Sequence, residues 1–135
     1  SGRVVGPENP KKVSVAVSAA YAARTERQFQ RIVRGYLAHL GFVVWAFPEM
    51  RMTAPGVPDL LFWHPRRPGR FWAWELKTAK GRVRREQTMA IAHLATVEGV
   101  HARIVRPADW PDLRDELVEV AFGFGAVVTA IKERR

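Results

Sequence analysis

A pair of short apolar segments joined by a turn places the strongest constraint on the fold. Residues 60–63 (LLFW) and 71–77 (FWAWELK) are rich in residues typical of β-strands, and residues 64–69 (HPRRPG) between them form a strong turn signal. Two strands with so short a connection predict a β-hairpin. Residues 42–47 (FVVWAF) predict a further strand before the hairpin.

A helical pattern precedes these strands. Phe29, Val33 and Leu37 belong to an apolar stripe with three- and four-residue spacing that continues to Leu40. Gly41 is a natural end for such a helix, because glycine readily adopts the backbone conformation that follows a last turn.

The start of this first helix has two possible positions. Thr25 and Gln28 have the spacing of a capping box, which would place the start at Thr25. The Ala-rich residues 18–24 favour an earlier start near Ser18. The sequence pattern leaves both positions open.

The second half of the chain predicts two more helices with a strand between them. A helix is expected over about residues 84–97 and a strand over residues 100–105. Asp109 and Pro111, a capping acid followed by a first-turn proline, predict a last helix that ends at about Val120.

The resulting order of elements is α-β-β-β-α-β-α. A helix before a hairpin, followed by a strand-helix-strand crossover, predicts an α/β fold with a mixed central sheet of about four strands flanked by helices. Residues 13–135 are expected to form a single domain after a flexible tail at residues 1–12. The apolar segment at the start of residues 121–135 could form a strand, a short helix or an oligomer contact.

The charge balance favours a polyanionic partner. The 22 Lys and Arg and 13 Asp and Glu give a formal net charge of +9, and a surplus of that size on a small domain favours nucleic acid. An acidic membrane surface is the alternative partner. The chain, however, has no lipidation signal and no apolar run near the roughly 18 residues that cross a bilayer. A basic composition without any ligand would also explain the charge. We expect a cytoplasmic protein of a bacterial cell or phage-infected host, with no membrane partner.

The absence of cysteine excludes several classes of chemistry. With no Cys in the chain, disulfide scaffolds, thiolate zinc sites and cysteine nucleophiles are all excluded. The Trp residues are expected in the core, with Trp45 and Trp63 packing across adjacent strands rather than stacking on bases. Structural or solvated roles are expected for the four histidines, which show no metal-ligand spacing: His39, His64, His93 and His101.

The strand predicted at residues 71–77 carries the most informative side chains. With a period of two, Glu75 and Lys77 emerge on one face beside the small Ala73. Asp59 precedes the neighbouring strand of the hairpin and can lie opposite them. Two carboxylates and one amine suit Mg²⁺-assisted cleavage of a phosphodiester bond, because this hard cation prefers oxygen ligands and polarises the phosphoryl group. An ordinary cross-strand ion pair on a solvated face would give the same pattern.

Several of these motifs, in this order, resemble a known nuclease family. Gly56-Val57-Pro58-Asp59-Leu60, then Glu75-Leu76-Lys77, then Gly81 and Gln87 are similar to the core of a VRR-NUC domain, a branch of the PD-(D/E)XK nuclease superfamily. The likeness extends from about Glu26 to Arg106. It implies a restriction-endonuclease-like core and a phosphodiesterase that depends on Mg²⁺ or Mn²⁺.

The resemblance also implies roles for the central residues. Asp59, Glu75 and the backbone carbonyl of Leu76 would hold the divalent metal. Lys77 would activate the attacking water and offset charge on the phosphate.

Two further residues match family positions, and each has a structural alternative. The resemblance places Gln87 near the scissile phosphate, whereas a solvated helix residue is the alternative. Glu26 fits the acid that the family carries on its first helix. Its alternative is a first-turn acid that complements the helix dipole or joins the capping box, and the sequence leaves both interpretations open.

Basic residues elsewhere are expected to contact the DNA backbone without reading its sequence. Neutralising about six phosphates would give a log–log salt slope of about −5, and solvation is the alternative for any single residue. The candidates lie on the first helix, near the start of the second helix and at the hairpin tip: Arg24, Arg27, Arg31, Arg34, Lys80, Arg82, Arg84, Arg85, Arg66 and Arg67, with Arg70 beside them.

Family analogy gives the preferred substrate. Stand-alone members imply a structure-specific endodeoxyribonuclease of DNA recombination or repair, with Holliday-junction resolution by a homodimer as the preferred reading. A flap or nick nuclease and a non-catalytic DNA-binding module of the same fold remain as alternatives. A structural protein whose charge is incidental is a further one.

Overall fold

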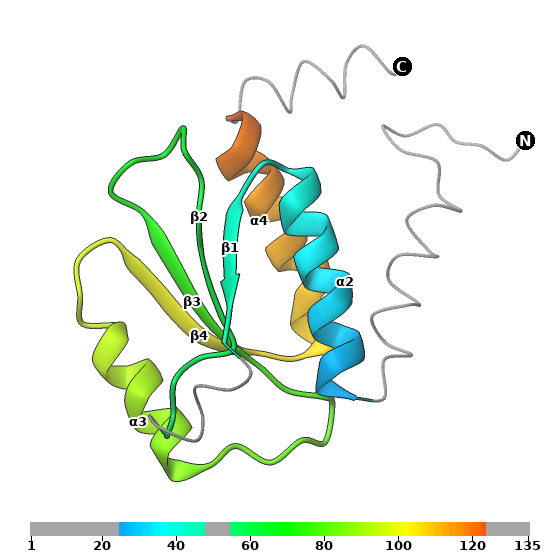
Figure 1. The fold of residues 1–135 in the computed structure, drawn as a ribbon, viewed down its shortest axis with the longest axis vertical. Helices are drawn as coiled ribbons and strands as arrows, with labels where there is room; N and C mark the ends of the chain where they lie inside the picture. Colours follow the sequence, from blue (N-terminus) through cyan, green and yellow to red (C-terminus); the bar gives the residue numbers. More distant parts are fainter. Residues whose placement is uncertain (1–24, 48–54, 124–135) are drawn as a thin grey trace, which may run out of the picture.

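A computed structural model describes residues 25–47 and 55–123 (Figure 1). It confirms an α/β protein with a four-stranded mixed sheet flanked by helices. The predicted flexible tail, the possible helix start near Ser18, the basic residue Arg24 and residues 124–135 lie outside the described residues. The elements are α2 (Glu26–His39), β1 (Val43–Ala46), β2 (Leu60–Trp63), β3 (Phe71–Leu76), α3 (Arg85–Leu94), β4 (Val100–Val105), a 3₁₀ turn (Pro107–Asp109) and α4 (Trp110–Phe122).

The sheet has the order β1-β2-β3-β4. β1 pairs antiparallel with β2, and β2 pairs antiparallel with β3 as the predicted hairpin, with Leu60 opposite Trp74. β4 pairs parallel with β3, with Glu75 opposite Ile104. The helix α3 makes the crossover between these two parallel strands, as such a connection requires.

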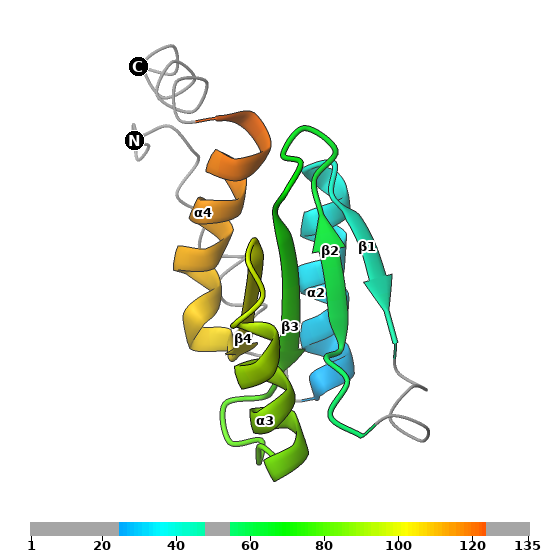
Figure 2. The ribbon, with the colours of Figure 1, turned by 90° about the vertical axis from the view of Figure 1, so that its left-hand side faces the viewer.

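The helices cover the two faces of the sheet unequally. α2 and α4 lie on one face, where the Trp110 ring contacts both Tyr36 of α2 and Trp74 of β3 (Figure 1). α3 lies on the other face, over β3 and β4 (Figure 2). On this second face, no helix among the described residues covers β1 and β2.

The capping box of α2 is present, and it settles where this helix starts. The Thr25 hydroxyl accepts from the Gln28 amide at 3.1 Å, and the Gln28 side chain accepts from the Thr25 amide at 3.2 Å. The helix therefore begins at Glu26. Its buried stripe consists of Phe29, Val33 and Leu37, all fully enclosed.

Two predictions about the helices differ from the structure. The predicted helix 84–97 ends at Leu94, because the following amides of Thr96 and Val97 bond to carbonyls three residues back rather than four. Asp109 does not cap α4 with its side chain. Its carboxylate instead accepts from the Arg106 amide at 2.8 Å and so stabilises the 3₁₀ turn before α4.

The tryptophans are only partly in the core. Trp72, Trp74 and Trp110 are buried, but Trp45 is 53% exposed, so the prediction of a core role for it is wrong. The predicted cross-strand contact of Trp45 with Trp63 is confirmed, with ring centroids 5.0 Å apart. Trp45 is exposed because β1 is an edge strand and its outward face has no helix over it among the described residues.

The described helices are all too short or too polar to cross a bilayer.

Candidate active site

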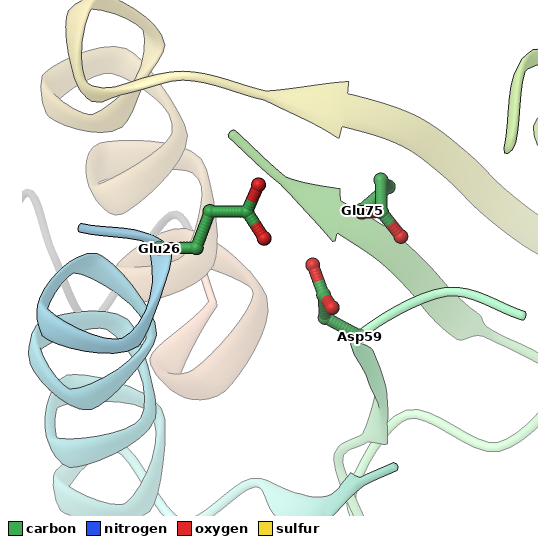
Figure 3. Close-up of side chains that lie close together, drawn as sticks. All are labelled: Glu26, Asp59 and Glu75. Carbon is green, nitrogen blue, oxygen red and sulfur yellow. The ribbon is translucent and has the colours of Figure 1, made fainter. Parts of the chain in front are cut away.

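Three carboxylates from distant parts of the chain converge at one end of the sheet. Glu26 begins α2, Asp59 immediately precedes β2, and Glu75 lies near the end of β3 (Figure 3). One carboxylate oxygen from each lies within 4.8 Å of the other two. Asp59 and Glu75 are buried, and Glu26 is partly buried. The structure thus brings together all three acids that the sequence marked, including Glu26.

The hairpin register places Asp59 at the cluster. Leu60 pairs with Trp74, so Asp59 comes opposite Glu75 one step beyond the paired residues. The Leu76 amide donates to Asp59 Oδ2 at 2.7 Å and fixes the carboxylate in place. Because the N–H and C=O of a strand residue point toward the same neighbour, we expect the Leu76 carbonyl on the side of the acids as well.

Glu75 is held by the helix that follows it. Gln87 Nε2 donates to Glu75 Oε2 at 2.8 Å, and Gln87 Oε1 accepts from the Arg84 amide at 2.9 Å. Gln87 is only 4% exposed, so it is not the solvated helix residue that was the alternative for this position. Its side chain joins the first turn of α3 to the acid on β3.

Lys77 lies between two of the carboxylates. Its Nζ is 3.3 Å from Glu26 Oε1 and 3.5 Å from Glu75 Oε2. The side chain is buried, so this is not the solvated surface ion pair that the strand pattern alone allowed. Placing one ammonium between two acids offsets part of their mutual repulsion.

The donor set fits a hard divalent cation. Three carboxylates and one ammonium have formal charges that sum to −3 + 1 = −2. Bringing like charges this close is unfavourable unless a cation joins them. All three side-chain donors are oxygens, which Mg²⁺ and Mn²⁺ prefer, and the cluster contains none of the sulfur or imidazole ligands that favour softer metals.

A glycine allows the loop before β2 to pack closely against α3. Gly56 has φ +90°, and a side chain there would place its Cβ 2.5 Å from the Glu86 carbonyl oxygen. Only glycine allows this backbone angle and this approach without strain. The Gly-x-Pro-Asp segment therefore packs on the first turn of α3, which carries Gln87.

Arg106 is a positioning residue that the sequence analysis did not identify. Its Nη1 donates to the carbonyls of Thr78 at 2.7 Å and Gly81 at 2.9 Å. These bonds shape the loop that follows Lys77 and carries Lys80. A single arginine between a strand and a turn gives no pattern from which such a role could be read.

The predicted DNA-contacting residues fall into separate regions. Arg27, Arg31 and Arg34 line a groove between α2 and β1, together with Phe42 and Val44. Four exposed residues surround the start of α3: Lys80, Arg82, Arg84 and Arg85.

The basic residues of the hairpin tip lie far from the acids. β3 has six residues, which at about 3.3 Å each separates the tip from the acidic end by about 20 Å. Arg67 Nη1 donates to the Arg66 carbonyl, and Arg70 Nε donates to His101 Nε2 at 3.2 Å. Arg66 and Arg67 could therefore contact only a distant part of a long substrate.

Two histidines have defined surroundings away from the acids. His64 is buried and bonded to backbone groups at the hairpin end of β2. His101 stacks on Trp72. Partial burial lowers the pKa of His101 below its usual 6.5, the Arg70 guanidinium lowers it further, and Glu116 opposes both.

Comparison of the chain with protein-family models, with curated proteins and with solved structures finds no match.

Proposed function

We propose that this protein is a divalent-metal-dependent endodeoxyribonuclease with a restriction-endonuclease-like core, active with Mg²⁺ or Mn²⁺. The observation that carries the proposal is the convergence of Glu26, Asp59 and Glu75 around the buried amine of Lys77. A mixed sheet that presents two acids and a lysine from its hairpin, with a third acid from a helix, is an arrangement suited to phosphodiester hydrolysis.

In this proposal, Asp59 and Glu75 would hold the cation through their carboxylates, and the Leu76 carbonyl and Glu26 would supply further oxygen donors. When bound, the cation would polarise the phosphoryl group and lower the pKa of a coordinated water. The Leu76 amide and the Gln87 side chain keep the two acids oriented before substrate arrives.

Lys77 would orient and activate the attacking water. Its Nζ lies at the edge of the acid cluster and carries three donors on one atom. An ammonium there would hold the water in line with the phosphorus and offset the charge that develops on the phosphate oxygens. Gln87 would lie next to the scissile phosphate through its contact with Glu75.

Branched DNA is the substrate class we propose, with Holliday-junction cleavage by a homodimer. A net charge of +9 supports a long contact with DNA phosphates. The Arg groove beside α2 and the basic residues around α3 give two separate phosphate-binding surfaces next to the acids. A dimer would place two such sites on two strands of one branched duplex.

The direct test is cleavage of end-labelled four-way, fork, flap and linear duplex DNA with Mg²⁺ and with EDTA. The wild type should cut with Mg²⁺ only, and Asp59→Asn and Lys77→Ala should cut at least about a hundredfold more slowly. Asp115→Asn is a matched control, because Asp115 is a 78% exposed acid on α4.

The results separate the alternatives clearly. Tight, salt-dependent binding without Mg²⁺-dependent cleavage would identify a non-catalytic DNA-binding module. Cleavage that Asp59→Asn and Lys77→Ala leave intact would place the active site elsewhere. Sedimentation of the same samples tests the dimer.

A further inference from the structure

The edge strand β1 carries different chemistry on its two faces. Successive residues of a strand point to opposite faces, so Val43 and Trp45 point one way while Val44 points the other. Val44 lines the groove beside α2, together with Arg27, Arg31 and Arg34. Val43 and Trp45 are exposed on the face where no described helix covers β1.

A row of aromatic rings crosses this open face. Trp45 contacts Phe47 at 6.2 Å and Trp63 at 5.0 Å between ring centroids. Trp63 stacks on Phe71 of β3 at 5.7 Å, with the ring planes 12° apart. We call Phe47, Trp45, Trp63 and Phe71 the aromatic row. Trp45 is its most exposed member, whereas the other three are half-buried.

The row begins at the acid cluster. The Phe47 amide donates to the Asp59 carbonyl at 3.1 Å, so Phe47 is bonded to the backbone of a candidate metal ligand. The basic groove has the same starting point on the other side of β1, because Arg27 follows Glu26 in α2. Both surfaces therefore lead away from the reacting groups.

We propose that β1 binds an unpaired segment of the DNA substrate, with phosphates in the basic groove and bases stacked on the aromatic row. This inference depends on the nuclease function proposed above and concerns the DNA next to the cleaved bond, which is an unpaired arm in a fork or flap, or bases that unpair at the branch point of a four-way junction. Aromatic side chains stack on bases of any sequence, and positive grooves follow the backbone, so the two surfaces suit single-stranded DNA.

The composition of the face favours bases over an apolar partner. Its exposed anchor is a tryptophan, whose flat ring matches a base, and arginines line the groove directly behind the same strand. The arginines on the opposite side of this one short strand complement a polyanion rather than a second copy of a chain with a net charge of +9. Self-association of two copies through this face is the alternative that the experiment below can reveal.

Binding to a short oligothymidylate and to an abasic oligonucleotide of the same length tests the proposal. Fluorescence anisotropy in EDTA and low salt measures both without cleavage. Trp45→Ala should weaken binding of the oligothymidylate about tenfold, which corresponds to about 1.4 kcal/mol, and change abasic binding less than about twofold. Trp45→Phe should restore most of the difference because the ring is kept.

Two further variants are informative. Val97→Ala removes another exposed apolar side chain, near the start of β4 at the opposite edge of the sheet, and should change neither affinity. Arg31→Ala should weaken binding of both oligonucleotides equally and reduce the log–log salt slope by about 1. Equal affinities of Trp45→Ala and wild type for the oligothymidylate would overturn the proposal. So would a Trp45→Ala variant that loses self-association in sedimentation and keeps base binding.

The same variant separates this inference from the nuclease itself. Trp45→Ala should lose the wild-type preference for cutting DNA with an unpaired segment over fully paired linear duplex. If wild type cuts and Trp45→Ala keeps that preference, only the stacking inference is wrong. If wild type shows no metal-dependent cleavage, the proposed function is wrong, and the anisotropy results still decide whether bases bind.

Discussion

The residues on either side of β2 are both buried and polar, yet they differ in what surrounds them. Asp59 precedes the strand and His64 follows it, and each is 3% exposed. Both ring nitrogens of His64 bond to backbone: Nδ1 accepts from the Arg66 amide, and Nε2 lies 3.1 Å from the Leu40 carbonyl, to which it donates. Asp59 instead lies within 4.8 Å of two other acids.

The difference shows that burial alone does not identify a functional polar residue. His64 joins the end of α2 to the hairpin turn, and its polar atoms are satisfied by groups the fold places there, so it stabilises the structure. At the other end of the same strand, like charges are gathered at a cost in stability. Such a cost is expected where a site is arranged for a ligand rather than for folding.

The change expected to matter most is Asp59→Asn, which should affect cleavage at one end of β2 without lowering stability. Asp59→Asn should lower DNA cleavage on the order of a thousandfold, because it removes a charged ligand of the proposed metal site. The same variant should unfold at the same denaturant concentration as wild type or higher, since one like charge has gone. A marked loss of stability with retained cleavage would reverse the roles assigned to the two ends.

His64→Ala should give the opposite result. Losing one buried and one partly buried bond to backbone and the edge contact with Phe42 should lower the free energy of unfolding by about 2–4 kcal/mol. Cleavage measured well below the melting temperature should stay within about twofold of wild type. Urea unfolding followed by circular dichroism, beside the cleavage assay, checks both statements. A stable variant without activity would give His64 a catalytic role instead.

A substitution at Glu26 tests whether this acid belongs to the proposed metal site. Glu26 is the most exposed of the three acids, and its carboxylate also lies 3.3 Å from Lys77 Nζ. Glu26→Gln should raise the Mg²⁺ concentration for half-maximal cleavage about tenfold and leave the rate at saturating Mg²⁺ within a few fold. Glu98→Gln, in the loop after α3, is the control. An unchanged Mg²⁺ requirement would restrict the site to Asp59 and Glu75.

The last prediction concerns the pH dependence of stability and a second histidine at the hairpin end of the sheet, His101. The pKa of His101 is lowered by partial burial and then by Arg70, against Glu116, so the unfolded chain binds its proton more readily than the folded one. Its contribution to stability is therefore present above the unfolded pKa of 6.5 and is lost as the pH falls below it.

The difference between wild type and His101→Gln isolates this contribution. The wild-type melting temperature should fall more than that of the variant between about pH 7.5 and about pH 5.5. The metal requirement for cleavage should not differ between the two proteins. A variant with the steeper acid dependence would contradict the direction of the shift.

The strands and the central pair of site residues could be predicted because the signals are local. Alternation along residues 71–77 puts Glu75 and Lys77 on one face, and the hairpin register then brings Asp59 opposite them. The capping box at Thr25 and Gln28 is likewise a short-range pattern.

The features that the sequence left open depend on contacts between distant elements. Gln87 reaches Glu75 only because the α3 crossover folds back on β3. Trp45 is exposed because no described helix covers its face of the sheet. The alternation of residues in β1 does not indicate which face a helix covers. The bonds from Arg106 to the loop after Lys77 link residues more than 20 positions apart, and no local pattern encodes them.

We propose that Asp59 and its neighbouring acids bind a divalent cation, and a calorimetric titration of the protein with Mn²⁺ measures this binding itself. Wild type and Asp115→Asn should bind Mn²⁺ saturably. At about 100 times the dissociation constant, Mn²⁺ should raise the free energy of unfolding by about 2.7 kcal/mol. Asp59→Asn should show neither effect. Equal Mn²⁺ binding by wild type and Asp59→Asn would show that these acids do not form the metal site.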